Sequence, residues 1–326
     1  MPHDPSDAAA PLTAVDRTPV HRLPRLAALL GMQQDALWIK RDDLTGLAGG
    51  GNKARKLVPL LAAARAAGAD TLVTGGGAQS NHARMTAAAA AIHGMGSHLV
   101  LNRPPVPDQG GNLLLDGLFG AGVTWTQALP FADLQTAIEE CCEKLRAGGR
   151  KPYSIPVGGS SVLGASAYLD VAQEIGEQLD PGLVVVATGS GGTHAGLAAG
   201  FGDHARVLGV DVGALPDVAT VVRDLSTAVA AHAGREAPRG SVSLDRARIG
   251  DGYGLPTEAG HEALLAAARC DGILLDPVYT AKAMAGLFAA RRDGRIEAST
   301  RVLFLHTGGL PGLFAHRYAD WAGSLL

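Results

Sequence analysis

The sequence predicts an α/β protein of two domains, built from open, mostly parallel sheets covered by helices. Three observations support this fold class. Short apolar runs of β-forming residues alternate with Ala-rich segments of helical length. The chain of 326 residues is long enough for a sizeable core and two domains. Glycine-rich turns follow several strand ends, at residues 75–77, 189–192 and 308–309, and open α/β sheets bind ligands beyond such ends.

The elements follow from this alternation, taken in chain order. The predicted strands are residues 37–41, 71–74, 98–101, 153–157, 183–188, 207–212, 273–275 and 302–306. The predicted helices are residues 56–67, 85–93, 134–146, 165–178 and 258–269, with a further helix after the turn at 189–192. Pro59 should start, kink or delay the first helix because it has no N–H to donate.

Composition and charge exclude several function classes. The formal net charge of −3 provides no basic field for nucleic acid, and no apolar run reaches membrane-spanning length. The adjacent Cys141 and Cys142, with Cys270, fit a reducing compartment better than a disulfide framework. The first seventeen residues lack the pattern of a signal peptide. We therefore expect a cytoplasmic protein with a loose N-terminal tail, residues 1–17.

The most informative segment is the glycine turn that carries Lys53. Three glycines and Asn52 precede this lysine, and a helical pattern follows it. A lysine held on a tight, partly desolvated turn loses proton affinity and can act as an amine nucleophile. The alternative is a solvated basic face made of Lys53, Arg55 and Lys56.

A second glycine turn follows the predicted strand 183–188. Strand, glycine turn and helix together form a phosphate cradle, to which Ser190 and Thr193 can add hydroxyl donors. Gly189 and Gly191 also imitate half of a dinucleotide-binding motif, but His194 replaces its third glycine. The turn therefore favours a monophosphate over a pyrophosphate, and a nicotinamide-dependent oxidoreductase remains the competing class.

Other polar residues follow strand ends and can face the same crevice. Ser80 and Asn81 lie near a helix start suited to a carboxylate, although Ser80 can simply cap that helix. Tyr279 can stack on an aromatic cofactor or be a packed core tyrosine, and Thr307 adds a neutral hydroxyl. No paired ligand spacing supports a metal site at the histidines, which are His82, His194 and His306.

In this order, the segments resemble the fold-type-II pyridoxal-phosphate enzymes, which are tryptophan synthase β-like, and within them the D-cysteine desulfhydrase and 1-aminocyclopropane-1-carboxylate (ACC) deaminase family. The likeness extends from about residue 18 to residue 314. Its motifs are KRDD at 40–43, GGNKARKL at 50–57, QSNH at 79–82, IPVGGS at 155–160, ATGSGGTHAG at 187–196, GYG at 252–254, DPVYT at 276–280 and HTGG at 306–309.

The resemblance implies a cofactor, pyridoxal 5′-phosphate, and a role for each matching residue. Lys53 matches the lysine that binds the cofactor covalently, Asn81 the residue that contacts its phenolic oxygen, and Tyr279 the tyrosine that stacks on it. The phosphate loop corresponds to Thr188, Gly189, Ser190, Gly191, Gly192 and Thr193, and Thr307 lies at the same cofactor. Ser80, Asn81, His82 and Tyr253 match the substrate region. Lys53 is the expected acid/base, with Ser80 or Tyr279 as the rival proton-transfer group.

Two threonines favour the desulfhydrase branch. The deaminase branch has glutamate at the position of Thr280 and leucine at that of Thr307. A carboxylate opposite the pyridine nitrogen strengthens the ring as an electron sink, as ring opening requires, and a neutral threonine cannot. The resemblance thus implies α,β-elimination from a small amino acid, with D-cysteine giving pyruvate, sulfide and ammonia. L-cysteate sulfo-lyase is the alternative, ACC deaminase follows, and a non-catalytic amino-acid-binding protein is the remaining class.

The resemblance also implies the arrangement of the domains. Residues 18–56 with 166–326 form a large cofactor-binding domain, and residues 57–165 form a smaller inserted α/β domain. Lys53 is expected in the cleft between them, since cofactor sites favour domain interfaces. Family analogy suggests a homodimer that acts on a small amino acid.

Overall fold

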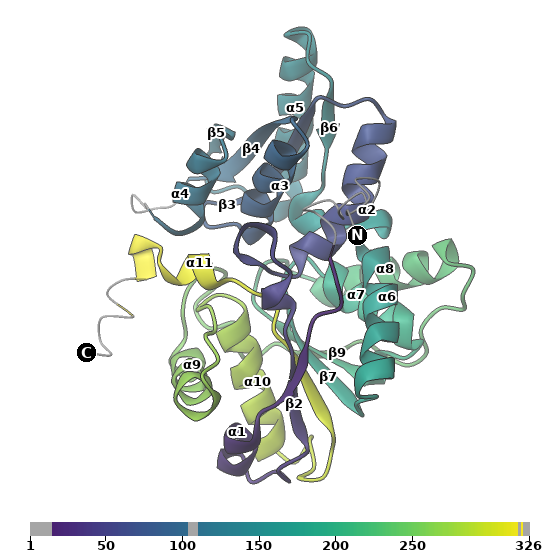
Figure 1. Ribbon diagram of the computed structural model, residues 1–326, viewed down its shortest axis with the longest axis vertical. Coiled ribbons are helices and arrows are strands. Elements are labelled where there is room, and N and C mark those ends of the chain that lie inside the picture. Colours follow the sequence, from purple (N-terminus) through teal and green to yellow (C-terminus); the bar gives the residue numbers. More distant parts are fainter. Residues whose placement is uncertain (1–14, 104–109, 319–320, 322–326) are drawn as a thin grey trace, which may run out of the picture.

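The larger of two sheets is built from both ends of the chain (Figure 1). The computed structural model describes residues 15–103, 110–318 and 321. The strand order of this sheet is β1 (Val20–Arg22), β2 (Leu37–Lys40), β10 (Val302–Leu305), β7 (Leu183–Thr188), β8 (Val207–Asp211) and β9 (Ser243–Asp245). Only the β1–β2 pair is antiparallel within it. The late strand β10 therefore lies at the centre, between β2 and β7.

The smaller sheet is wholly parallel and comes from the middle of the chain. Its strand order is β5 (Gly122–Thr126), β4 (Gly96–Asn102), β3 (Thr71–Gly77) and β6 (Pro152–Ser154). On one face α5 (Phe131–Ala147) packs against Val73 and Val100. On the other face α2 (Lys53–Ala66) and α3 (Asn81–Ile92) cover Leu72 and Leu99, and α4 (Gly111–Leu118) lies beside α3.

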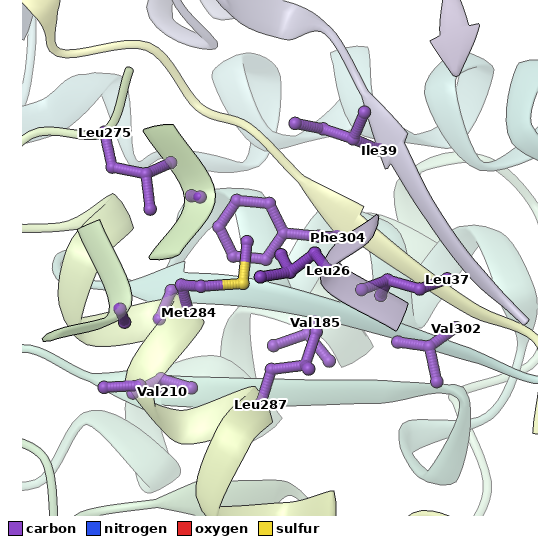
Figure 2. Packing of buried hydrophobic residues seen from close by; sticks show 14 of the residues in the cluster. Leu26, Leu37, Ile39, Val185, Val210, Leu275, Met284, Leu287, Val302 and Phe304 are labelled. Carbon is purple, nitrogen blue, oxygen red and sulfur yellow. The ribbon is translucent and has the colours of Figure 1, made fainter. Parts of the chain in front are cut away.

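Helices cover the larger sheet on both faces because its strands alternate their apolar side chains. Val302 and Phe304 of β10 join the core beneath α1 (Pro24–Leu29), α9 (Glu258–Asp271) and α10 (Thr280–Arg292), which Figure 2 shows from close by. Leu303 and Leu305 face the opposite core, under α6 (Val162–Gln178) and α7 (Gly192–Phe201). The helix α8 (Val218–His232) packs on α6 and α7, and the short α11 (Leu310–Leu313) lies beside α4. The predicted fold class is confirmed.

Some element predictions are wrong. Residues 273–275 form no strand: Ile273 and Leu275 are buried, but Leu274 is 52% exposed and the segment pairs with no neighbouring strand in the described chain. Pro59 neither starts nor delays its helix, because α2 begins at Lys53 and continues past it. Three short strands, β1, β5 and β9, were not predicted.

We propose the domain division at residues 57 and 165 on the basis of strand membership. All four strands of the smaller sheet fall between these positions, and the strands of the larger sheet fall outside them. The predicted N-terminal tail, residues 1–17, lies outside the described residues except for 15–17.

Candidate cofactor pocket

Residues from both sheets line one pocket, with about 700 Å³ of atom-free space if the open solvent at its mouth is included. It lies beyond the carboxyl ends of β3 and β7, where ligands of open α/β sheets bind. The structure brings all the predicted site residues into its lining: Lys53, Ser80, Asn81, His82, Thr188, Gly189, Ser190, Gly191, Gly192, Thr193, Tyr253, Tyr279 and Thr307. Their individual roles stay predictions.

Lys53 is the first residue of α2, and a tight glycine turn places it in the pocket. Gly50 has φ +75°, and a Cβ there would lie 1.8 Å from the Asp43 carbonyl oxygen, so only glycine fits. The turn is also tied to the end of β10, because the Asn52 N–H donates to the Thr307 carbonyl at 3.1 Å. Two distant parts of the chain therefore fix the start of α2.

The environment of Lys53 favours its neutral amine. Burial lowers its pKa to about 8; the Asp276 carboxylate opposes this shift and the Arg84 guanidinium adds to it. The Nζ atom donates to the Asn52 side-chain oxygen at 3.1 Å. Lys53 is thus held in place with an amine more readily deprotonated than that of an exposed lysine, as a nucleophile requires.

The start of α7 supplies an anion cradle. Gly191, in the left-handed conformation, precedes the helix, whose first N–H groups have no acceptors of their own within the helix. The hydroxyls of Ser190 and Ser160 are 2.7 Å apart, and the Gly192 N–H donates to Ser160 Oγ at 3.2 Å. The Thr188 hydroxyl contacts His194 at 3.1 Å. Polar hydrogens and the helix dipole therefore meet at one end of the pocket.

Lys56 and Asn52 belong to the same cradle, although the sequence did not single them out. Lys56 is 1% exposed, and its Nζ atom donates to the Gly158 carbonyl and Ser160 Oγ at 3.2 and 3.3 Å. Asn52 Nδ2 donates to Thr193 Oγ1 at 2.9 Å. The interpretation of Lys53, Arg55 and Lys56 as a solvated face is wrong, since Arg55 is also only 7% exposed. The three-residue spacing of Lys53 and Lys56, which share one helix face, was the available signal.

The start of α3 forms another wall of the pocket. Ser80 caps this helix, accepting from the Ala83 N–H at 3.1 Å, and lines the pocket as well. Asn81 follows it as the first helical residue. Both ring nitrogens of the buried His82 have no hydrogen-bond partner in the described chain. Burial, and then the positive charges of Lys53 and Lys56, lower the pKa of His82 far below its usual value, so this imidazole is neutral.

Aromatic rings form the third wall. The hydroxyls of Tyr253 and Tyr279 are hydrogen-bonded to each other, and the two rings pack edge to face with their centres 6.0 Å apart. Phe131, which was not predicted, packs against Tyr253 at 5.3 Å. Asp276, which was not among the predicted site residues, accepts hydrogen bonds from the N–H groups of Val278, Tyr279 and Thr280 at 2.8 to 3.0 Å. A carboxylate thus holds the turn that presents Tyr279.

The two threonines that favoured the desulfhydrase branch, Thr280 and Thr307, differ in their position relative to the pocket. Thr307 lines the pocket, but Thr280 is buried outside its lining and donates to Asp276 Oδ2 at 2.7 Å. His306 contacts the Leu274 carbonyl at 2.9 Å and accepts from the Gly308 N–H. Within the described residues there is no group of three or more metal-ligating side chains.

A family model described as "Pyridoxal-phosphate dependent enzyme" matches residues 12–308. The chain belongs to this family of pyridoxal-phosphate dependent enzymes. It is 43% identical over 322 residues to the D-cysteine desulfhydrase of Salmonella schwarzengrund (strain CVM19633), an alignment that covers 92% of this chain and 93% of that protein.

Solved structures agree with this membership. The crystal structure of an ACC deaminase homologue superimposes with a TM-score of 0.87 at 36% identity, covering 97% of this chain and 95% of the other. The processed threonine deaminase isoform 2 of Solanum lycopersicum shares the fold, with a TM-score of 0.64 at 19% identity and coverage of 97% and 86%.

None of the helices in the described part of the chain has the length and apolarity needed to cross a bilayer.

The pocket fits pyridoxal phosphate on its own geometry. Within the described residues, the buried amine of Lys56 donates to neutral oxygens alone, and burial lowers its pKa far below the ordinary value; a phosphate would supply the counter-charge that keeps this amine protonated. A Cβ on Gly192 would lie 2.5 Å from Ser160 Oγ and 2.7 Å from Lys56 Nζ, so glycine keeps the backbone N–H groups accessible. The cradle suits a single phosphate better than a pyrophosphate. Together with the family match, this excludes the alternative of a nicotinamide-dependent oxidoreductase.

Proposed function

We propose that this enzyme catalyses α,β-elimination from D-cysteine, giving pyruvate, sulfide and ammonia. The observation that carries this proposal is the 43% identity, over most of both chains, to a protein named D-cysteine desulfhydrase. Family membership supplies the cofactor, and the pocket supplies one lysine of lowered pKa beside an anion cradle.

Each wall of the pocket takes one part of the cofactor and substrate in this proposal. Lys53 binds the cofactor covalently, while Lys56, Ser190 and the first N–H groups of α7 hold its phosphate. Tyr279 packs against its ring and Asn81 meets its phenolic oxygen. Ser80, His82 and Tyr253 surround the substrate, whose carboxylate lies at the start of α3.

The elimination requires one proton removed and one bond broken. When bound, pyridoxal phosphate withdraws electrons from the substrate Cα and so stabilises negative charge there. With cofactor and substrate bound, the Lys53 amine would take the Cα proton. The Cα–H electron pair then forms the Cα–Cβ double bond, and the Cβ–S pair leaves with the sulfur as sulfide. The released aminoacrylate is hydrolysed by water to pyruvate and ammonia.

Ser80 and Tyr279 are the alternative proton carriers for the opposite face. Burial raises the pKa of Tyr279 well above its usual value, and the neighbouring Tyr253 raises it further. The hydroxyl therefore stays protonated at neutral pH and acts as a donor, which suits assistance to the leaving sulfur.

The lining of the pocket favours a thiol over a sulfonate leaving group. A sulfonate carries a full charge on three oxygens and calls for a dedicated cation. Of the described residues that line the pocket, only Lys53 and Lys56 are cationic, and the proposal assigns both to the cofactor. Arg84 lies outside the lining.

A substrate panel tests the proposal with the purified holoenzyme. D-cysteine, L-cysteine, L-cysteate, β-chloro-D-alanine and ACC are compared, with pyruvate, or 2-oxobutyrate for ACC, as the readout. We expect D-cysteine and β-chloro-D-alanine to yield pyruvate. Turnover of L-cysteate with D-cysteine inert overturns the desulfhydrase assignment, and 2-oxobutyrate from ACC as the main activity overturns the elimination itself.

We also propose a cytoplasmic homodimer. Cys141 and Cys142 are buried as free thiols, which suits a reducing compartment. Family analogy supports the dimer. Sedimentation equilibrium of the holoenzyme at micromolar concentration should give twice the monomer mass of 33.2 kDa, and a monomer mass contradicts it.

A further inference from the structure

Arg84 lies on α3, directly behind the pocket wall that begins with Ser80 and Asn81. Its side chain is fully buried. The nearby Asp116 carboxylate raises the pKa of Arg84, but burial lowers it more, and within the described residues no hydrogen bond joins Asp116 to Arg84. Instead Arg84 donates to the Asn81 Oδ1, Asn112 Oδ1 and Gly50 carbonyl oxygens, at 3.2, 2.9 and 2.9 Å. A cation buried on neutral acceptors is an expensive way to fill a core, so a role in placing these groups is the better explanation.

The contacts of Arg84 fix which way the Asn81 carboxamide faces. A guanidinium donates and never accepts, so the Asn81 oxygen must face it. The Asn112 amide adds a second donor to the same oxygen at 3.0 Å, and is itself bound by the Gln79 carbonyl at 2.9 Å. With its oxygen engaged behind the wall, Asn81 has its NH₂ group left to offer the pocket. The phenolic oxygen of pyridoxal phosphate is an acceptor, so this is the group it needs.

The bond to Gly50 joins Arg84 to the second half of the site. Gly50 begins the turn that delivers Lys53, and its conformation is open only to glycine. The same guanidinium therefore links the wall that contains Asn81 to the turn that contains Lys53, although these belong to different parts of the chain.

We propose that Arg84 is a positioning residue, which holds the Asn81 NH₂ group toward the cofactor and ties it to the Lys53 turn. The inference rests on the proposed function only in placing Asn81 at the cofactor. Arg84 does not touch the reacting atoms; it acts through Asn81 and Gly50.

The test measures cofactor binding to the apoenzyme. Pyridoxal phosphate is titrated into wild type, Arg84→Met, Asn81→Ala and the double variant, and the dissociation constant and visible absorption band are recorded. We expect Arg84→Met and Asn81→Ala each to weaken binding about tenfold or more, the cost of a lost charge-assisted or cofactor hydrogen bond. In the double variant the second substitution should cost less than it does alone. Arg84→Lys keeps the charge but loses the planar fork, so it should restore the fold and not the affinity.

Arg291 provides the matched control. Arg291 is a half-buried arginine that donates to two backbone carbonyls, those of Gly31 and Ile296, and lies outside the pocket. Arg291→Met should lower thermal stability and leave the dissociation constant and band unchanged. Full additivity of Arg84→Met with Asn81→Ala, or unchanged affinity in a folded Arg84→Met, overturns the inference.

If Arg84→Met does not fold, Asn112→Leu replaces it in the same cycle, since it removes a donor to Asn81 and leaves the Gly50 bond. Non-additivity with Asn81→Ala supports the inference, and additivity overturns it. Should Asn81→Ala alone leave affinity and band unchanged, the placement of Asn81 in the proposed function fails. Should only the Arg84 and Asn112 variants be without effect, the positioning inference fails and that placement stands.

Discussion

The two sides of α2 bury positive charge in opposite ways. On the side away from the pocket, Arg55 donates to Asp42 at 2.9 Å and to Glu174 at 3.0 Å, while Lys40 also pairs with Glu174. Burial alone would lower the pKa of Arg55, but Asp42, Tyr168 and Glu174 raise it overall. On this side both buried cations, Arg55 and Lys40, have a carboxylate partner.

On the pocket side of α2, the cations have no such complement. Lys56 is buried on neutral oxygens, and burial followed by the charge of Lys53 lowers its pKa far below the ordinary value. Within the described residues, the Nζ atom of Lys53, one turn earlier, donates to the Asn52 side-chain oxygen alone. The comparison teaches that paired burial on one face is structural, whereas unpaired burial on the other marks where an anionic ligand belongs.

The largest effect should come from Lys53. Lys53→Ala removes the amine that we propose binds the cofactor and moves the proton, so pyruvate formation should fall by about a thousandfold or more. The measurement is steady-state turnover, with borohydride reduction followed by peptide mapping to locate the modified lysine in wild type. Near-normal turnover in the variant would refute the role, as would reduction that labels Lys56 instead.

On the side of α2 that faces away from the pocket, Arg55→Met should destabilise the fold without removing a residue that lines the pocket. Removing Arg55 leaves Asp42 buried without its cation and Glu174 with Lys40 alone, at a cost of about 3–5 kcal/mol in the free energy of unfolding. Urea denaturation of the apoenzyme measures this. Arg146→Met breaks an exposed pair with Glu143 and serves as the control, with an expected change below about 0.5 kcal/mol. Equal effects of the two variants would erase the distinction drawn between the faces.

On the unpaired side, Lys56→Met should give the reverse pattern. The variant loses a buried amine that has no carboxylate partner among the described residues, so the apoenzyme should be no less stable than wild type. It also loses the cation at the phosphate end, so binding of pyridoxal phosphate should weaken about tenfold to a hundredfold. Urea denaturation and cofactor titration of the same preparation check both parts. A destabilised apoenzyme with normal affinity would place Lys56 with Arg55 among the structural charges.

The smallest effect is a pH dependence carried by Lys53 in the apoenzyme. Its folded-state pKa of about 8 is below the ordinary 10.5, so between these values the unfolded chain binds the extra proton. Wild-type stability should therefore rise with pH across this window relative to Lys53→Met. Other groups titrate there too, which is why the difference between the two proteins is measured by urea denaturation at each pH. A difference that stays constant or falls would show that Lys53 is not desolvated in the apoenzyme.

The strands of both sheets were predictable wherever burial gave them continuous apolar character. The runs in β7, β8 and β10 are buried throughout nearly all their length and stand out in the sequence. The strands β1, β5 and β9 have only three to five residues with partly exposed side chains, so no pattern marks them. Residues 273–275 show the opposite error, because two buried side chains imitated a strand where the backbone has no partner.

The site was predictable where chemistry follows a glycine turn. The turns before Lys53 and α7 and the start of α3 all reach the pocket. Lys56, Asn52, Asp276 and Phe131 escaped because their importance depends on tertiary neighbours, such as the Ser160 loop that meets Lys56. Thr280 shows that adjacency in a motif does not place a side chain, since it faces Asp276 instead of the pocket.

The central position of β10 has a consequence for biosynthesis. Residues 302–305 are synthesised after every other strand of the larger sheet, yet they fill the gap between β2 and β7. Until they arrive, those two strands present open hydrogen-bonding edges on either side of the gap, which are templates for pairing with another chain. Growing polypeptides of this enzyme are therefore exposed to aggregation until β10 has been made, and a premature stop before residue 302 yields a product whose larger sheet stays open.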